Sequence, residues 1–280
     1  MNKIMIFSFL CSTISLFYAS EHQSSKKIGI FSDINKRKFQ EDFFYHGIVD
    51  GGNLYAVYDG HFCHRVGYTE NDDNNGCAIA KFLAEKFSIY FKKASGSTIK
   101  ERMMAAFKNA DNDEFVKENK DCGSTAAIVF IKDNVAHCAY VGDSRALLER
   151  NGKINFVTQD HIPNKLDESL RIIKAGGVIF ERRVNGFLSI TRAFGDYILD
   201  KKLIIADPDY EEIPLTTEHK FLVLASNGLW NMVSNEEVVG ILNAKKSIQD
   251  MNLLAKMLAI FAVHRGSRDN ITVMLVDLLS

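Results

Sequence analysis

The amino-acid sequence predicts an α+β protein whose β-sheets are antiparallel. Short runs rich in β-branched and aromatic residues, which are typical of β-strands, recur at residues 53–59, 124–131, 134–143, 220–226 and 271–278. Only Lys132 and Asp133 separate the second run from the third, so these two runs must form a hairpin and lie antiparallel. The predicted helices gather in clusters between the strands, which disfavours a doubly wound parallel sheet.

The helices are predicted from apolar residues at helical spacing. Residues 78–93 and 98–119 follow the first strand, and residues 252–265 precede the last one. Residues 165–177 predict another helix that stops at its two final glycines. Ser234, with Glu237 three residues later, forms a capping box that starts a further helix.

The composition indicates one large globular domain with almost no net charge. The chain has 280 residues and is 46% hydrophobic, enough to bury a substantial single core. Its 34 basic and 35 acidic residues nearly cancel, so no overall charge draws it to nucleic acid or to an anionic membrane. We therefore expect no nucleic-acid partner, and we expect a monomer.

Residues 1–20, MNKIMIFSFLCSTISLFYAS, have the pattern of a secretory signal peptide. An early Lys3 precedes an apolar stretch that is short for a membrane span, and the small residues Ala19 and Ser20 follow. Phe17 stands where a cleavage site prefers a small residue, so a retained membrane anchor is the alternative. The expected domain is residues 21–280, secreted or periplasmic.

Removal of the signal peptide would leave four cysteines, an even number in the oxidising compartment that export implies. Cys63 and Cys77 bracket a polar loop that a disulfide would close, and we hypothesise this bridge. Cys122 and Cys138 lie in apolar, strand-like runs, so we expect them to be small core residues.

The chemistry-bearing residues are carboxylates at strand ends or beside glycine. Motifs of several enzyme classes are absent from the sequence, including G-x-S-x-G, H-E-x-x-H, C-x-x-C, the Walker loop and G-x-G-x-x-G. The carboxylates are Glu41, Asp42, Asp59, Asp143, Asp196 and Asp269. Such groups would repel one another at a common cleft unless cations lay between them, and oxygen ligands suit Mg²⁺ or Mn²⁺. Each D-G or D-N pair alone is a turn signal, but their occurrence together with Arg37 and His61 favours a metal site.

Several motifs, in order, resemble those of the metal-dependent protein phosphatases (PPM), the type 2C Ser/Thr phosphatases. They are RKFQED, VYDGH, GSTA, YVGDSRALL, DHIPN with the following helix to AGG, RVNGFLSITRAFGD, LASNGLWNMVSNEE and RDNITVMLV. The resemblance covers about residues 28–278. It implies two antiparallel β-sheets packed face to face and flanked by helices, an α-β-β-α sandwich, which agrees with the antiparallel prediction.

The same resemblance implies a binuclear Mn²⁺ or Mg²⁺ site. Asp59 would bridge the two cations, the carbonyl of Gly60 would bind one of them, and Asp269 would bind the other. Glu41 and Asp42 would hold metal-bound waters.

The remaining roles concern the substrate, which the resemblance implies is a phosphoserine or phosphothreonine protein. Arg37 would clamp the phosphate, and His61 would protonate the leaving alkoxide. Asp143 would contribute to a third, weaker metal site. Arg192 and Asp196 are assigned to the scaffold and not to catalysis.

Two asparagines depart from the family pattern. At Asn227 the family has an aspartate that coordinates a metal, and Asn231 likewise replaces an acidic residue. An amide oxygen can still coordinate a hard cation, but it brings a dipole instead of a charge, and ligand charge is a main determinant of affinity. We therefore expect a weakened second metal site and a phosphatase of reduced rate. The alternative is a pseudophosphatase, a regulatory module that binds phosphoprotein or a partner without hydrolysis.

Overall fold

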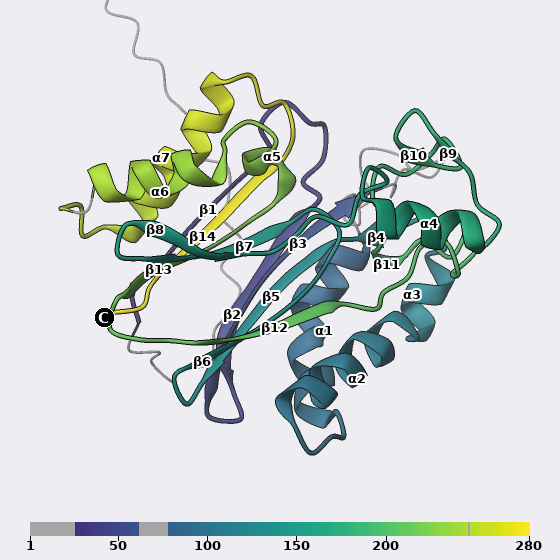
Figure 1. Ribbon diagram of the computed structural model, residues 1–280, viewed down its shortest axis with the longest axis horizontal. Helices are drawn as coiled ribbons and strands as arrows, with labels where there is room; N and C mark the ends of the chain where they lie inside the picture. The colour runs from purple at the N-terminus through teal and green to yellow at the C-terminus, as the bar shows by residue number, and fades with distance from the viewer. Residues whose placement is uncertain (1–25, 62–77, 246) are drawn as a thin grey trace, which may run out of the picture.

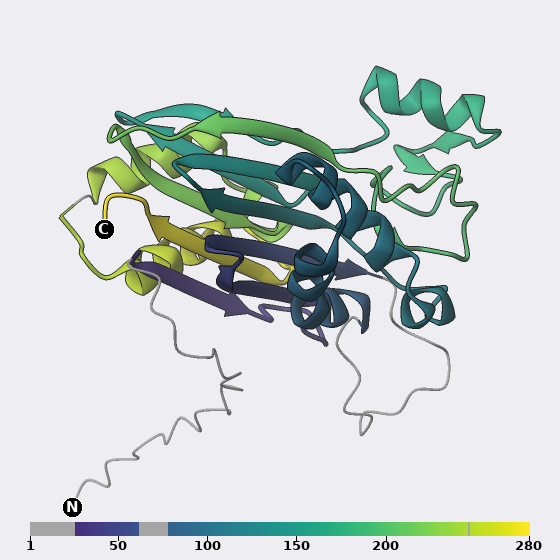
Figure 2. The same cartoon turned by 90° about the horizontal axis from the view of Figure 1, so that it is seen from below.

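The computed structural model describes residues 26–61, 78–245 and 247–280. The predicted signal peptide, residues 1–20, and the hypothesised Cys63–Cys77 disulfide lie outside the described residues. Two β-sheets pack face to face, and helices cover both outer surfaces (Figures 1 and 2). This arrangement confirms the predicted α+β fold with antiparallel sheets.

The larger sheet of the described residues has seven strands, and every pairing in it is antiparallel. Its members are β2 (Asp42–Val49), β3 (Gly52–His61), β4 (Gly123–Ser124), β5 (Ala126–Lys132), β6 (Val135–Val141), β11 (Phe194–Gly195) and β12 (Asp209–Pro214). Strands β5 and β6 form the predicted hairpin. Its turn residues are Asp133 and Asn134, both at positive φ, one position later than the sequence suggested.

The smaller sheet runs in the order β1-β14-β13-β7-β8. Its strands are β1 (Ile28–Asp33), β7 (Arg145–Arg150), β8 (Lys153–Val157), β13 (His219–Ala225) and β14 (Ile271–Asp277). Strands β13 and β14 match predicted runs, whereas β1, β2, β7, β8 and β12 were not predicted.

The helices are α1 (Ala78–Lys93), α2 (Ile99–Asp111), α3 (Glu114–Glu118), α4 (Leu166–Lys174), α5 (Asn227–Trp230), α6 (Asn235–Ala244) and α7 (Met251–His264). The predicted segment 98–119 is two helices, because Asn112 ends α2 and the Asp113 side chain accepts a hydrogen bond from the Phe115 N–H (2.9 Å) to start α3. The predicted capping box at Ser234 and Glu237 is confirmed at the start of α6.

Each sheet buries both faces. In β3, Leu54, Ala56 and Tyr58 pack toward α1 and α2, whereas Tyr55 and Val57 pack against the other sheet. Strand β14 alternates in the same way between α7 and the space between the sheets. Burial on both faces explains why these strands are continuous apolar runs in the sequence.

A smaller unit projects beside the larger sheet, on the right of Figure 1. It contains α4 and the hairpin of β9 (Ile179–Phe180) and β10 (Arg183–Val184), and we call residues 162–205 the α4 lobe. The lobe has its own apolar cluster, formed by Ile172, Val184, Leu188, Ile190, Ala193, Leu203 and Ile204. The lobe therefore has an apolar core of its own, and β11 (Phe194–Gly195), within the same range, joins it to the larger sheet.

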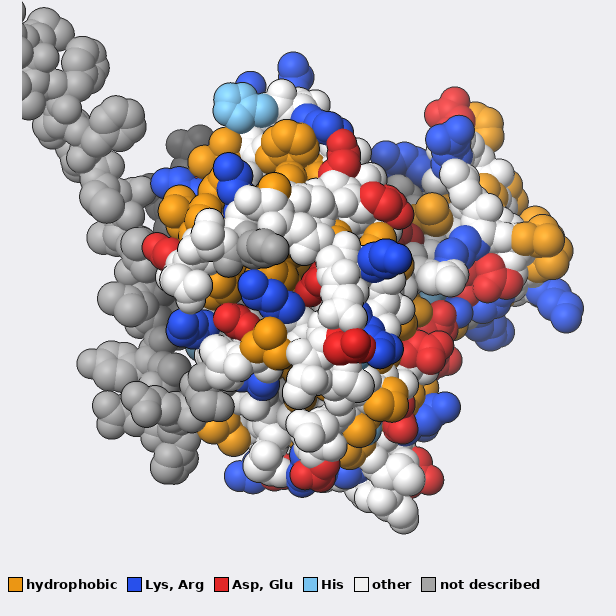
Figure 3. Space-filling view, turned by 60° about the vertical axis from the view of Figure 1, so that its left-hand side comes forward, with side chains coloured by type: hydrophobic (Ala, Val, Ile, Leu, Met, Phe, Trp, Pro, Cys, Tyr) orange, Lys and Arg blue, Asp and Glu red, His pale blue; other side chains and the backbone are white. Residues whose placement is uncertain are grey.

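Surface and burial agree with the composition. Basic and acidic side chains are interspersed over the face shown in Figure 3. Cys122 and Cys138 are both buried, as expected for core residues. None of the helices in the described part of the chain has the length and apolar character needed to cross a bilayer.

Candidate active site

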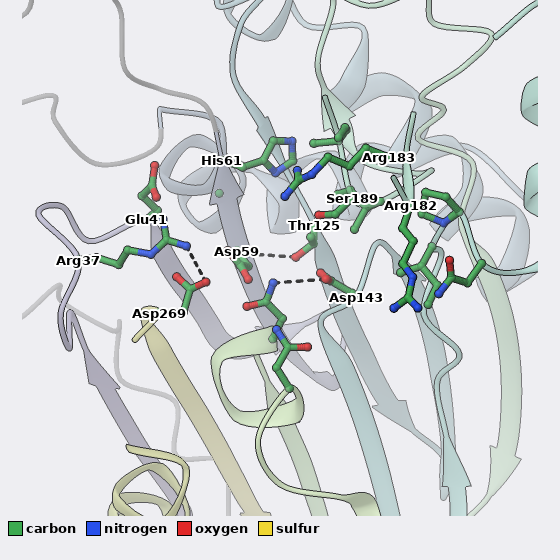
Figure 4. A pocket seen from close by; sticks show the side chains of 18 residues that line it. Arg37, Glu41, Asp59, His61, Thr125, Asp143, Arg182, Arg183, Ser189 and Asp269 are labelled. Carbon is green, nitrogen blue, oxygen red and sulfur yellow. Dashed lines mark hydrogen bonds and ion pairs between the residues drawn. The ribbon is translucent and has the colours of Figure 1, made fainter. Parts of the chain in front are cut away.

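A pocket of about 650 Å³ opens where β3 and β13 end and β7 and β14 begin (Figure 4). Nearly all the residues singled out from the sequence line it: Arg37, Glu41, Asp59, Gly60, His61, Asp143, Asn227, Asn231 and Asp269. Arg37 and Asp269 are 232 residues apart in the chain. The fold thus brings these side chains together, as the sequence hypothesis required.

Asp59, in the VYDGH motif, is held at the end of β3 by hydrogen bonds to Thr125, in the GSTA motif. Its backbone N–H donates to Thr125 Oγ1 (3.3 Å), and its carbonyl accepts from the Thr125 N–H (2.9 Å). Thr125 Oγ1 in turn lies 2.7 Å from Ser144 Oγ, beside Asp143. These bonds fix the pocket floor to both sheets.

Asp42 differs from the other predicted metal-site residues because it does not line the pocket. It is the register partner of Asp59 on the neighbouring strand β2, and it is 3% exposed. Its Oδ2 accepts a hydrogen bond from Ser226 Oγ (2.6 Å). Burial, with the charges of Asp269 and Glu41, raises the Asp42 pKa to about 7. Asp42 is therefore a buried support of the pocket floor.

The pocket carboxylates carry more negative charge than they can stabilise alone. Burial raises the Asp59 pKa well above its usual range, and the neighbouring charges of Asp42, Asp143 and Asp269 add to this effect. Burial and Asp160 raise the Asp143 pKa to about 6. Carboxylates crowded in this way favour a bound cation, because a positive charge removes their mutual repulsion.

Arg37 lies at the pocket edge on a loop that Asn270 fixes. Its Nη2 donates to Asp269 Oδ2 (2.7 Å). The Asn270 amide donates to the carbonyls of Ile34 and Phe39 (2.9 and 3.0 Å), on either side of Arg37. Partial burial opposes the guanidinium charge, but the hydrogen bond and charge of Asp269 raise the Arg37 pKa. Arg37 therefore stays a cation facing the carboxylates (Figure 4).

His61 contacts Asp196, which the sequence assigned to the scaffold. Its Nε2 lies 2.8 and 3.0 Å from the two carboxylate oxygens of Asp196. Burial lowers the His61 pKa, but the Asp196 charge and hydrogen bond outweigh it and raise that pKa. Arg192, by contrast, bonds to Glu168 and Asp209 away from the pocket, as a scaffold residue would.

Asn227 is the first residue of α5 and reaches Asp143. Its Nδ2 donates to Asp143 Oδ2 over 3.3 Å. A Cβ on the next residue, Gly228, would lie 2.0 Å from the Asn270 carbonyl oxygen, so only glycine lets this turn approach β14. Asn231 lines the pocket with an exposed side chain.

The donors present fit hard divalent cations. Asp143 Oδ1 and Asn227 Oδ1 are buried and have no hydrogen-bond partner among the described residues, so a cation can satisfy them. In the described ranges, no three Asp, Glu, His or Cys side chains form a complete metal cluster by themselves. The carboxylate and amide oxygens that are present are of the type that hard cations such as Mg²⁺ take as ligands.

Sequence reasoning missed several pocket residues. Arg182 and Arg183 come from the α4 lobe and line the pocket opposite the carboxylates. Arg182 and its neighbour Glu181 have positive φ, at the turn between β9 and β10. The pair of adjacent arginines before the Asn185–Gly186 turn was the available signal. Asn270, which holds the loop of Arg37, was also missed. Its signal in the sequence was the D-N pair that it forms with Asp269.

Comparison with known proteins agrees with the fold and the pocket. Residues 34–271 match the family model described as Protein phosphatase 2C. The chain is 36% identical over 265 residues to "Probable protein phosphatase 2C 59" of Arabidopsis thaliana, covering 90% of this chain and 79% of the relative. It is 35% identical to "Probable protein phosphatase 2C 69" of the same plant, covering 90% of this chain and 70% of the relative.

Solved structures share the architecture. A C. elegans sex determining protein superposes with a TM-score of 0.80 at 24% identity, over 92% of this chain and 66% of that one. A serine-threonine phosphatase 2C from Toxoplasma gondii superposes with a TM-score of 0.67 at 25% identity, over 90% of this chain and 94% of that one. With the family match over most of its length, the chain belongs to the protein phosphatase 2C family of serine/threonine phosphatases.

Proposed function

We propose that this protein hydrolyses phosphoserine and phosphothreonine in proteins with a pair of Mn²⁺ or Mg²⁺ ions, at a rate reduced by Asn227. The observation that supports the proposal is the convergence of Arg37, His61 and buried carboxylates in one pocket. The pocket provides a cation for the phosphate, an acid for the leaving group and oxygen donors for metals.

The metal-holding residues would be Asp59, the Gly60 carbonyl, Asp269, Asp143 and Asn227. Glu41 and Asp42 contribute further carboxylate oxygens, which accept hydrogen bonds beside these metal-holding residues. Divalent cations held in this way lower the pKa of water toward neutrality and offset the charge of a phosphate dianion. Because water then serves as the nucleophile, no serine or cysteine nucleophile is required from the chain.

Arg37 would bind the phosphate. Its planar guanidinium can make two parallel hydrogen bonds to phosphate oxygens, which a lysine cannot. The Asp269 bond to Nη2 and the loop bonds of Asn270 set its orientation before substrate arrives. The pre-set orientation reduces the entropy lost when the phosphate binds.

His61 would donate a proton to the leaving alkoxide of serine or threonine. Its raised pKa, caused by Asp196 against the opposing effect of burial, keeps the ring protonated to higher pH. General acid catalysis of this kind typically contributes a factor of ~10² to 10⁴. An alkoxide is a strongly basic leaving group, so this substrate class benefits most.

The second candidate is a pseudophosphatase. The observation that favours it is the pair of amides, Asn227 and Asn231, which remove two acidic side chains from the pocket. Asp59, Asp143 and Asp269 remain, so most of the negative charge that attracts cations is still present. We therefore propose catalysis with weakly bound metal ions as the function. Binding of phosphoprotein without turnover is the second candidate.

For location and assembly, we propose an exported monomer. The support for export is the signal-peptide pattern of residues 1–20. Mass spectrometry of the protein from its native cell should give a mature N-terminus near residue 21. A chain that begins at Met1 in a membrane fraction would favour the retained anchor instead.

The proposed activity is tested by combining metal binding with turnover. Isothermal titration with Mn²⁺ should show binding that Asp59→Asn abolishes. Assays with p-nitrophenyl phosphate and a phosphothreonine peptide should show Mn²⁺-dependent release of phosphate. Tight binding of the phosphopeptide without turnover, even at high Mn²⁺, would establish the pseudophosphatase.

A further inference from the structure

We propose that Asp196 is a positioning residue that holds the His61 ring by Nε2, so that Nδ1 carries the proton exchanged with the substrate. This inference rests on the proposed role of His61 as the general acid. The mechanism needs such a residue because an imidazole has two nitrogens, and a general acid works only if the right one bears the mobile proton.

The contact between the two side chains is close and sheltered. Nε2 of His61 lies 2.8 Å from Oδ2 and 3.0 Å from Oδ1 of Asp196. The Asp196 side chain is 2% exposed, whereas that of His61 is 19% exposed. His61 lines the pocket and Asp196 does not. Asp196 can therefore affect a substrate only through His61.

The carboxylate is fixed by a turn that other residues hold. The Asp196 N–H donates to the Cys122 carbonyl (2.8 Å), and the preceding Gly195 N–H donates to Asp111 Oδ1 (2.8 Å). Lys201 Nζ bonds both to the Gly195 carbonyl and to Asp111. Asp196 has φ +54°, a left-handed conformation that is uncommon for non-glycine residues. Strained residues of this kind are often retained at functional sites.

Gly123 leaves space for the pair. Strand β4 pairs with β3 at His61 and with β11 at Gly195, so Gly123 lies between the two partners. A Cβ on Gly123 would lie 2.3 Å from His61 Nε2 and 2.3 Å from Asp196 Oδ2. Any side chain there would push the two groups apart, so the glycine of the GSTA motif is required by this contact.

A carboxylate that accepts from Nε2 selects one form of the ring. Its negative charge keeps the proton on Nε2 in both the neutral and the charged imidazole, as a buried aspartate does for the histidine of a serine protease. The proton that the ring gains and loses is then on Nδ1. An asparagine at position 196 would keep the size of the side chain but lose this selection.

The protein contains a second histidine–aspartate contact that serves as a matched control. His161 Nε2 lies 3.2 Å from Asp209 Oδ2, and His161 is buried outside the pocket lining. Both contacts tie a histidine to a carboxylate beside the sheet. Asp209 is more exposed than Asp196, at 44%, and also pairs with Arg192. Asp209→Asn therefore removes a histidine–carboxylate contact without touching the proposed acid.

The first test compares leaving groups. Asp196→Asn should lower kcat on a phosphothreonine peptide by about 10-fold or more, up to the ~10²–10⁴ that a general acid supplies, with KM changed less than kcat. On p-nitrophenyl phosphate the loss should be much smaller, because a nitrophenolate leaves without a proton. Asp209→Asn should change the two substrates equally. Equal losses on both substrates in Asp196→Asn would overturn the proposal.

The second test needs no turnover. A long-range ¹H–¹⁵N correlation spectrum of the His61 ring, at a pH where it is neutral, should show a protonated Nε2 in the parent chain. Asp196→Asn should mix the two tautomers. A parent ring protonated on Nδ1 would refute the inference. If the parent chain shows no phosphatase activity, the proposed function fails by itself, and this spectrum still decides whether Asp196 sets the tautomer.

Discussion

The side-chain amide of Asn227 donates a hydrogen bond to the Asp143 carboxylate, with 3.3 Å between Nδ2 and Oδ2. This bond lowers the Asp143 pKa, against the stronger raising effects of burial and Asp160. An aspartate at position 227 could not donate it. The asparagine therefore stabilises the pocket without a cation and weakens the attraction for one.

Asn227→Asp should destabilise the metal-free pocket and strengthen its attraction for a cation. Without metal, loss of the donor and the added repulsion should lower the free energy of unfolding by about 1–3 kcal/mol. With saturating Mn²⁺ the variant should be stabilised more than the parent chain, and its turnover should need less Mn²⁺. Urea unfolding in EDTA and in Mn²⁺ measures both. Asn231→Asp, with an exposed side chain, is the control and should change the metal-free stability little. An unchanged Mn²⁺ response in Asn227→Asp would show that this amide does not limit metal binding.

Asp59→Asn should make the metal-free protein more stable. Burial and neighbouring carboxylates raise the folded-state pKa of Asp59, so at neutral pH its ionised form destabilises the fold relative to the unfolded chain. Removing that charge should raise the free energy of unfolding at neutral pH. The same variant should lose the increase in Tm that Mn²⁺ gives the parent chain. Thermal unfolding with and without Mn²⁺ tests both effects, and a variant less stable in EDTA would contradict the account.

Arg37→Ala should reduce phosphate binding. A charge-assisted hydrogen bond contributes about 1.5–3 kcal/mol, so kcat/KM for the phosphothreonine peptide should fall roughly 10- to 150-fold. Arg37→Lys should recover only part of the loss, because an ammonium cannot make the paired planar contact. Arg265→Ala removes an exposed ion pair with Glu237 and is the control. Full activity in Arg37→Lys would show that charge alone suffices.

The α4 lobe should loosen in acid. Burial would raise the Glu168 pKa, but hydrogen bonds from Arg192 and Arg171 lower it to about 2. A depressed carboxyl pKa stabilises the fold above the unfolded pKa of about 4.3, and this contribution is lost as pH falls toward 2. Glu168→Gln should therefore lower stability at pH 7 and flatten the decline between pH 5 and 3. Urea midpoints across this range provide the measurement, with Glu218→Gln, in an exposed pair with Arg150, as the control.

The strands that the sequence predicted are those buried on both faces. The run at residues 53–59 became β3 and the run at 271–278 became β14, because double burial demands continuous apolar residues. Strand β7 was missed because Arg145–Arg150 mixes charged and apolar residues without a strict alternation. The 98–119 segment was read as continuous because no proline or glycine marks the break at Asn112.

Many pocket residues were foreseen from carboxylates at strand ends or beside glycine and from the family resemblance. Arg37, Asp59, His61, Asp143 and Asp269 do line one pocket. Asp42 was placed with them, yet it lies buried beneath the floor and bonds to Ser226. A sequence motif specifies which residue types are present. The direction in which each side chain points from a strand depends on how that strand is in register with the adjacent strand.

The sequence by itself determined the antiparallel α+β class, the family and half of the residues that line the pocket, because hairpin spacing, apolar periodicity and ordered motifs are local properties of the chain. The tertiary structure decided which groups touch: Asp196 with His61, Asn227 with Asp143, and Arg182 and Arg183 opposite the carboxylates. These contacts join segments far apart in the chain, and their geometry depends on strand register, sheet packing and left-handed turns that no local pattern specifies.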